Sequence, residues 1–251
     1  MAGRILKNLI QYGVILVVFF AVWGLAHMWV GDDLLIPDVF SCIKEGFVLL
    51  GKGYFWTAFA RTFVRVLVAF SVSAMLAAVL ALIAYVKPSF AGVLSVLTSM
   101  MRTLPTMAVL LIFLVLTSAS VAPVLVAFLS LFPMLYTGFY AALNEVDGEL
   151  LEMSRAYNVP LKRKIMKLYL PCVTPYALRT LGSAFSFSLK WIVSAEVLAY
   201  TYRSLGGMMQ EAKIYMEMPT LFALVLIVFC VGLLFETGFE WLARHAERRG
   251  K

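Results

Sequence analysis

Two carboxylates near the end of the chain are the first side chains whose spacing suggests chemistry. Glu236 and Glu240 are four residues apart, so on a helix they lie one turn apart on the same face. A pair of carboxylates can serve as general acid and general base. Arg244 follows Glu240 by four residues, which is the spacing of an ordinary ion pair on a helix surface. The ion pair is the simpler interpretation, and we predict no catalytic site here.

A second candidate, GFVLLGKG at 46–53, nearly matches the phosphate-binding pattern G-x-x-x-x-G-K-[ST]. Its last position is Gly53, which has no hydroxyl group for magnesium, and no strand-to-helix unit surrounds it. We therefore expect that this chain binds no ATP, magnesium or other cofactor and does not hydrolyse ATP by itself.

The histidines and cysteines are too scattered for a metal site or a nucleophilic active site. The two histidines, His27 and His245, stand near opposite ends of the chain. Cys42, Cys172 and Cys230 are odd in number, and none lies at metal-binding spacing from another. We expect no metal site, no disulfide framework and no catalytic residue, and we interpret the cysteines as small apolar side chains.

The composition is that of a membrane protein. Of the 251 residues, 63% are hydrophobic and 14% are charged, whereas soluble domains are about 45–50% apolar and about 25% charged. Helices are the expected spanning elements because hydrocarbon cannot satisfy exposed backbone polar groups, and the apolar runs are too continuous for the alternating strands of a barrel. The net charge of +7 does not indicate nucleic-acid binding, since the basic residues cluster beside apolar runs, where membrane lipid is the expected partner.

Six segments are predicted to cross the membrane, so we expect an all-α protein with a single transmembrane domain over 1–251. The first segment is longer than the apolar core of a signal peptide, and we interpret it as an uncleaved span. The uncharged run 103–144 is too long for one span, since about 20 residues cross the bilayer core, and we divide it at LTSASVAP, 116–123. The predicted spans cover about 10–30, 62–86, 92–116, 121–143, 177–200 and 219–242.

Basic residues near the span ends predict the orientation, because cytoplasmic loops carry an excess of lysine and arginine. With both termini in the cytoplasm, the loop 144–176 is also cytoplasmic. Outside the membrane, LLIPDVFSCIKEGF is expected to form a short surface helix after Pro37. The basic residues then assigned to the cytoplasm are Arg4, Lys7, Lys87, Arg155, Lys162, Arg163, Lys164, Lys167, Arg244, Arg248, Arg249 and Lys251.

The cytoplasmic loop contains a predicted short helix, DGELLEMSRAY at 147–157. Asp147 can cap its first turn, and its carboxylate complements the positive end of the helix dipole. The helix is acidic and has only a narrow, partly apolar face, which favours a groove on a partner protein over a lipid surface. That face is made by Leu150, Met153, Ser154 and Tyr157, at positions i, i+3, i+4 and i+7.

A turn and a second helix are predicted to follow. Asn158 tolerates a left-handed backbone, and Pro160 prevents the first helix from continuing. The second helix, LKRKIMKLYL at 161–170, is strongly basic, so anionic lipid is one interpretation of its surface. Pro171 and Pro175 are then expected to lead the chain back into the membrane.

This stretch resembles the cytoplasmic loop of the membrane permease subunits of bacterial ATP-binding cassette (ABC) importers, often called the EAA loop. The common pattern is roughly D-P-x-L-L-E-A-A-R-x-L-G-A-S, followed after about ten residues by L-P, and DGELLEMSRAYNVPLKRKIMKLYLP matches it without a gap. The departures are Met153 and Ser154 in place of two alanines, and Asn158 in place of the turn glycine. The residues that fall on the pattern are Asp147, Leu150, Leu151, Glu152, Arg155, Leu170 and Pro171.

From about residue 34 onward, the chain is similar to the nitrate/sulfonate/taurine branch of that family. Four stretches carry the likeness: LLIPDVF at 34–40, TAFARTFVRVLVAF at 57–70, MRTLPTMAVLLIFLVL at 101–116 and VSAEVLAYTYRSLGGMM at 193–209. The resemblance implies the type I importer permease fold, with six transmembrane helices and a cytoplasmic coupling helix. It also implies a multi-pass protein of the bacterial inner membrane that carries a small organic or inorganic solute, which can be an anion.

The resemblance further implies partners and roles. Similar permeases pair as two membrane subunits, here expected as a homodimer, with two cytoplasmic ATPases that bind ATP and magnesium. A substrate-binding protein, either periplasmic or lipid-anchored, delivers the solute. The predicted coupling helix, about 148–158, lies in a cleft on the ATPase. The residues expected to couple hydrolysis to transport are Glu149, Leu150, Glu152, Met153, Arg155, Ala156, Tyr157, Asn158 and Val159.

Polar side chains in the fifth span are candidates for the translocation pathway. Charges at membrane depth usually face the bundle interior or water. Lys190 and Glu196 are about 120° apart around a helix and are not expected to pair. Lys190 either attracts an anion in passage or pairs with an acidic group of the second subunit. The candidate pathway residues are Ser186, Lys190, Ser194 and Glu196.

Beyond Glu196, the residues Arg203, Gly206 and Gly207 form either an outer gate with a glycine hinge or only a tight turn.

Two other functional classes remain as alternatives. A gradient-driven secondary transporter requires carboxylates in mid-span for its coupling ion, and usually more spans in two related halves. A membrane-embedded enzyme requires a cluster of acidic or histidine side chains at the membrane surface. The sequence offers neither set, apart from the pair Glu236 and Glu240.

Overall fold

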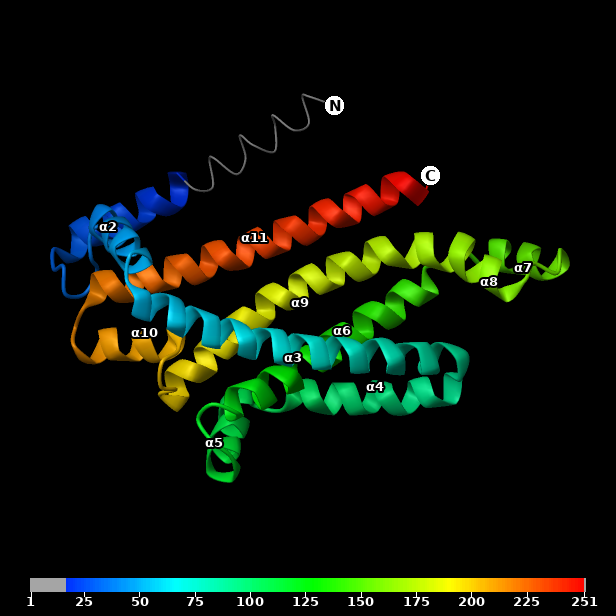
Figure 1. Ribbon diagram of the computed structural model, residues 1–251, viewed down its shortest axis with the longest axis horizontal. Helices are drawn as coiled ribbons and strands as arrows, with labels where there is room; N and C mark the ends of the chain where they lie inside the picture. The colour runs from blue at the N-terminus through cyan, green and yellow to red at the C-terminus, as the bar shows by residue number, and fades with distance from the viewer. Residues whose placement is uncertain (1–16, 251) are drawn as a thin grey trace.

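The computed structural model describes residues 17–250, and over this range the regular elements are helices (Figure 1). The part of the first predicted span over 10–16 lies outside the described residues, and the described part begins with an apolar helix, Val17–Val30. The labelled elements are α2 (Val39–Leu50), α3 (Gly53–Val86), α4 (Pro88–Thr103), α5 (Thr106–Leu116), α6 (Ala122–Asn144), α7 (Gly148–Ala156), α8 (Leu161–Lys164), the π-helix η1 (Ile165–Tyr169), α9 (Leu170–Ala199), α10 (Leu205–Ile214) and α11 (Met218–Gly250).

Four helices in the described range are long and apolar enough to cross a membrane. They are Gly53–Val86, Ala122–Asn144, Lys162–Ala199 and Met218–Glu247. Each coincides with one of the predicted spans to within one residue or extends several residues beyond it, because the apolar windows end before the helical hydrogen bonding does. The short helix predicted after Pro37 is present as α2, whose first turn is capped by the Asp38 carboxylate.

The helix predicted over 92–116 is broken. The α4 and α5 helices meet at an angle of 88° across a short break. Leu104 has φ −66° and ψ 129°, an extended conformation, which the following Pro105 favours because its ring crowds a helical residue before it. The α4–α5 pair is therefore either one broken span or a re-entrant segment.

Small residues allow α3 and α6 to pack closely along their lengths. The buried face of α3 repeats every three or four residues, and small side chains dominate it, as in closely packed membrane helices. The members of this face are Phe55, Ala58, Thr62, Val66, Ala69, Ser73, Ala77, Ala81 and Ala84.

Helix α9 crosses the middle of the bundle and packs against both α6 and α11 (Figure 1). At Gly138 of α6, an added Cβ would lie 2.3 Å from the Thr180 side chain, and at Gly182 it would lie 2.7 Å from Phe239 Cβ. Phe185 fills the centre, with its ring centroid 4.2 Å from that of Phe235. These contacts fix the register between α9 and its two neighbours.

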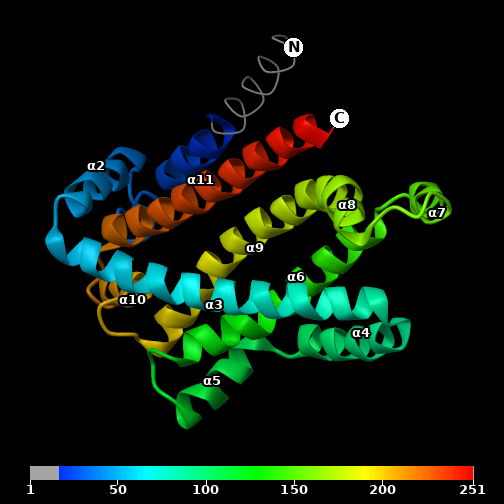
Figure 2. The ribbon, with the colours of Figure 1, turned by 45° about the vertical axis from the view of Figure 1, so that its right-hand side comes forward.

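The two ends of the bundle differ. Figure 2 shows α7 standing apart from the other helices at one end, where α6 and α8 lead to it. The short helix α10 lies near the opposite end of the molecule, where α9 ends and α11 begins (Figure 1). The long helices therefore connect a projecting helix at one end with a compact hairpin at the other.

Candidate functional site

Helix α7 forms at the position that the sequence predicts. Asp147 precedes its first residue, and the Asp147 carboxylate accepts a hydrogen bond of 2.9 Å from the Glu149 N–H group. This bond satisfies one of the amides that have no partner within the helix. Within the helix, the Ser154 hydroxyl donates to the Leu151 carbonyl at 2.7 Å.

The end of α7 is a closed turn centred on Asn158. Its φ of 48° is left-handed, as the sequence predicts. The Asn158 N–H group donates to the Arg155 carbonyl at 3.0 Å, and the Val159 N–H group donates to the Ser154 carbonyl at 3.0 Å. This paired arrangement is the Schellman motif, in which glycine usually takes the left-handed position. Asn158 thus performs the structural task of the family's turn glycine.

Helix α7 presents its side chains to solvent and has no buried residue. Met153 is 53% exposed and Tyr157 is 78% exposed, although both are large apolar or aromatic side chains. A nine-residue helix is too short to be stable alone in water, so exposed apolar residues on it indicate a surface that a partner covers. The predicted coupling residues that are exposed are Glu149, Leu150, Glu152, Met153, Arg155, Ala156, Tyr157 and Asn158, whereas Val159 is partly buried.

The second predicted helix of the cytoplasmic loop, 161–170, does not end at residue 170 as predicted. Helix continues from Lys162 to Ala199, and five of its residues, Ile165–Tyr169, form a π-helix. The wider π turn lets the Leu170 N–H group donate to the Ile165 carbonyl, and it absorbs the disturbance that Pro171 would cause in a regular ladder. The result is one continuous helix that joins the loop after α7 to the centre of the bundle.

At the π-helix, the Tyr85 and Tyr169 hydroxyl oxygens lie 3.4 Å apart. This contact connects the end of α3 with η1.

Three of the four predicted pathway residues line one cavity. Ser186, Lys190 and Ser194 recur every four residues on α9 and face a cavity of about 380 Å³ between α9 and α11. Glu236 of α11 lines the same cavity. Glu236 was considered above only as a partner of Glu240, and the predicted ion pair between Glu240 and Arg244 is present, at 2.6 Å.

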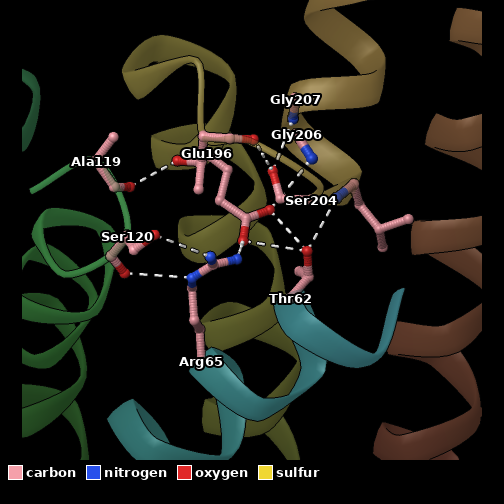
Figure 3. A network of polar contacts seen from close by, with 10 residues as sticks. Thr62, Arg65, Ala119, Ser120, Glu196, Ser204, Gly206 and Gly207 are labelled. Atoms are coloured by element: carbon pink, nitrogen blue, oxygen red, sulfur yellow. Dashed lines mark hydrogen bonds and ion pairs between the residues drawn. The ribbon is translucent and has the colours of Figure 1, made fainter. Parts of the chain in front are cut away.

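The fourth predicted residue, Glu196, points elsewhere. Its side chain is fully buried, and the Arg65 guanidinium Nη1 lies 2.8 Å from its Oε1 atom. The Thr62 hydroxyl donates to Glu196 Oε2 at 2.8 Å, and the Gly206 N–H group donates to the same oxygen at 3.2 Å. Figure 3 shows these groups converging on the carboxylate from α3 and from the first turn of α10.

The Glu196 network also holds the loop between α5 and α6. Arg65 Nε donates to the Ser120 carbonyl at 3.2 Å, and the Thr201 hydroxyl donates to the Ala119 carbonyl at 2.7 Å (Figure 3). The term Glu196 network denotes the side chains of Thr62, Arg65, Glu196, Thr201 and Ser204 together with their main-chain partners. The network thus joins four separate parts of the chain: α3, the α5–α6 loop, α9 and α10.

The two glycines after Glu196 are sites of very close packing. An added Cβ at Gly206 would lie 2.4 Å from Glu196 Cβ and 2.6 Å from the Val193 carbonyl oxygen. An added Cβ at Gly207 would lie 2.3 Å from the Thr201 carbonyl oxygen. Arg203 is exposed and has φ 50°, and its guanidinium carbon lies 5.1 Å from the Tyr202 ring centroid. Arg203 therefore lies beside the network, while the glycines are part of it.

Sequence analysis missed the role of Arg65 and Thr62, which lie within TAFARTFVRVLVAF at the start of the second predicted span. The sequence did contain a signal for this ion pair. An arginine inside an apolar run needs a partner, and the Glu196 carboxylate is expected at a similar depth in the membrane. The two residues are separated by 131 positions, and no periodicity in the sequence connects them.

Comparison with known proteins agrees with the family resemblance of the cytoplasmic loop. Residues 71–249 match the family described as "Binding-protein-dependent transport system inner membrane component". A segment of 148 residues is 28% identical to the protein SsuC of Bacillus subtilis (strain 168), whose name assigns it provisionally to aliphatic sulfonates transport as a permease protein. The matched segment covers 58% of this chain and 52% of that relative, so the chain spans about half the length of the relative it matches.

Proposed function

The chain belongs to the family of binding-protein-dependent transport system inner membrane components, and from this premise we propose that a separate cytoplasmic ATPase binds helix α7 and drives the transport. A member of this family is a transport permease component and not an enzyme. The observation that carries the proposal is α7 itself. It is a capped helix with no buried residue, and Met153 and Tyr157 are exposed at the tip of the molecule.

The fold offers a direct route from α7 into the bundle. The helix from Lys162 to Ala199 has 38 residues, which corresponds to about 57 Å at a rise of about 1.5 Å per residue. It passes Lys190 on its way and ends beside Glu196. A rigid rod of this kind can transmit a rigid-body movement of α7 to both places.

On this proposal, two copies of the chain assemble with two ATPases, which bind ATP and magnesium, and a periplasmic or lipid-anchored binding protein delivers the solute. The chain lies in the inner membrane of a bacterial cell. Both termini and α7 are on the cytoplasmic side, which is the orientation that the distribution of basic residues favours. Six spans result if the N-terminal helix and the α4–α5 pair each count as one.

We propose a small organic solute with an anionic group as the cargo. Two observations support this: Lys190 faces the cavity between α9 and α11, and the name of the SsuC relative refers to aliphatic sulfonates.

The test is recovery of the ATPase from native membranes in mild detergent, with the tagged chain as bait and mass spectrometry as the readout. We compare the wild type with Glu152→Lys on α7 and with Glu217→Lys, an exposed residue at the α10–α11 end of the molecule. Both substitutions change the charge equally, so only the location differs.

We expect an ATP-binding cassette ATPase with the wild type and Glu217→Lys, and loss of it with Glu152→Lys. Retention with Glu152→Lys would mean that α7 is not the contact. Absence of an ATPase from every sample would favour the gradient-driven alternative.

A further inference from the structure

The first turns of the long helix Lys162–Ala199 carry positive charge that the fold leaves unmatched. Lys162, Arg163 and Lys167 are all exposed, and we call these three residues the basic cluster. Within residues 17–250, the side chains of the basic cluster form no ion pair with an acidic residue. The negative charge that balances them therefore comes from outside this part of the chain.

The exposed surface changes from basic to apolar along this helix in the direction of the bundle. Arg163 and Lys167 are four residues apart, so they lie about one turn apart on the same side. Lys162, Met166 and Leu170 also follow one another at intervals of four residues. Met166 is 56% exposed and Leu170 is 58% exposed. A row of charge is thus followed, one turn further in, by apolar side chains that no part of the described chain covers.

A contact with α3 shows at which level of the molecule the basic cluster lies. The Tyr169 hydroxyl oxygen is 3.4 Å from that of Tyr85, and Tyr85 is the last residue but one of α3. Lys87 follows directly after the apolar sequence of α3. Lys167 precedes Tyr169 by two residues, which is about 3 Å along the helix axis. Tyrosine side chains are common where a membrane meets water, so the basic cluster begins at the level of the lipid headgroups.

Two kinds of partner carry negative charge at this level, an acidic protein surface and a phospholipid. An acidic protein surface would match the charges but would leave Met166 and Leu170 uncovered. A phospholipid presents a phosphate group followed by acyl chains, which is the order of basic and apolar side chains on the helix. Figure 2 shows α7 standing apart from α8 and the bundle, so an ATPase can reach α7 without covering the basic cluster. The observations therefore favour lipid.

We propose that the basic cluster binds the headgroup of an anionic phospholipid in the inner leaflet, with Met166 and Leu170 against its acyl chains. The bound lipid holds the start of the long helix at the membrane surface, while α7 stays free for the ATPase. The proposal adds a second contact to the coupling loop. It rests on the proposed function only for the orientation of this end of the bundle toward the cytoplasm.

The experiment measures lipid binding to the purified full-length chain in mild detergent by native mass spectrometry, which resolves each added lipid and gives its apparent Kd. The probes are phosphatidylglycerol and phosphatidylcholine with identical acyl chains, so they differ in the headgroup, which is anionic only in phosphatidylglycerol. No ATPase is present in this titration. A thermal unfolding curve for each variant verifies that it is folded.

A matched pair of triple variants separates the basic cluster from positive charge in general. Both variants remove three exposed basic residues, but the control removes them from three separate helices, α2, α3 and α10. A third variant keeps the charge and changes the side-chain shape. The three variants are Lys162→Gln with Arg163→Gln and Lys167→Gln, the control Lys44→Gln with Arg61→Gln and Lys213→Gln, and the charge-keeping Lys162→Arg with Lys167→Arg.

We expect the wild type to bind phosphatidylglycerol at least tenfold more tightly than phosphatidylcholine, because each basic residue near an anionic surface contributes roughly fivefold. The basic-cluster variant should lose this preference by weakening phosphatidylglycerol and leaving phosphatidylcholine unchanged. The control and the charge-keeping variant should retain it. Added salt should weaken the binding of phosphatidylglycerol to the wild type.

Equal affinity for the two lipids, no binding of either, or a preference that survives in the basic-cluster variant would overturn the proposal. Recovery of the ATPase from native membranes with the same variants decides between lipid and protein. Loss of the ATPase with an unchanged lipid preference would mean that the basic cluster contacts the ATPase instead. Failure of the α7 contact would appear with Glu152→Lys in the ATPase recovery and would not alter the lipid titration.

Discussion

Removal of the Arg65 charge should destabilise the protein more than any other single charge removal discussed here. Arg65 is only 12% exposed, and its partner Glu196 is fully buried. The substitution Arg65→Met keeps an unbranched apolar side chain and removes the guanidinium group. The Glu196 carboxylate then retains only the Thr62 hydroxyl and the Gly206 N–H group as donors, and it remains buried with its charge unmatched.

The expected cost follows from the burial of the pair. Breaking a buried ion pair from one side costs about 3–5 kcal/mol. In a chain of this size, 1 kcal/mol corresponds to about 2–4 °C in Tm, so we expect a decrease of roughly 6–20 °C. Arg61→Met is the matched control. Arg61 lies one turn earlier on α3 and is exposed, so its loss should change stability by no more than about 0.5 kcal/mol.

The assay is thermal unfolding in detergent, followed by tryptophan fluorescence, for a double-mutant cycle. Glu196→Gln in the Arg65→Met background removes the unmatched charge while the amide still accepts from Thr62 and Gly206. We expect the double variant to recover most of the loss, with a coupling energy of at least about 2 kcal/mol. The reasoning fails if Arg65→Met behaves like Arg61→Met, or if the effects of Arg65→Met and Glu196→Gln simply add.

Two further predictions concern backbone positions. Asn158→Val should raise hydrogen exchange of the α7 amides roughly 5- to 30-fold, because a left-handed β-branched residue costs about 1–2 kcal/mol, whereas Asn158→Gly should leave exchange nearly unchanged; equal exchange in both variants would contradict the role of the turn. Gly206→Ala should lower the free energy of unfolding by about 1–3 kcal/mol, since the new methyl group meets the Val193 carbonyl and Glu196 Cβ. Gly238→Ala on α11 has open space around it and should stabilise by about 0.5–1 kcal/mol; the same sign for both alanine variants in a thermal unfolding experiment would show that the packing at Gly206 is looser than described.

The sequence alone was enough for the features that depend on a few consecutive residues. The start of α7 at Asp147 and its left-handed end at Asn158 are set by hydrogen bonds that span two to five positions. The shared face of Ser186, Lys190 and Ser194 follows from the helical period. The family resemblance of the loop was carried by the same short stretch, and the match over 71–249 agrees with it.

The prolines show that residue type alone does not decide where a helix is interrupted. Pro105 separates two helices by 88°, but Pro133 and Pro175 lie inside continuous helices. The residue type is the same in each case, so the difference comes from the surroundings. Pro133 and Pro175 are buried, and their helices pack against neighbours on more than one side. Packing of this kind can hold a helix together through a missing backbone bond.

Only the tertiary structure decided which charges meet. Glu196 was assigned to the pathway with Lys190, yet it turns to Arg65, which is 131 positions away. Glu236 was matched with its sequence neighbours, yet it lines the same cavity as Lys190. Local hydrogen bonds determine the conformation of a helix and its ends, because their partners are always within reach along the chain. The pairing of side chains on different helices depends on the register and rotation of the packed helices, which are fixed by contacts such as those at Gly138, Gly182 and Gly206.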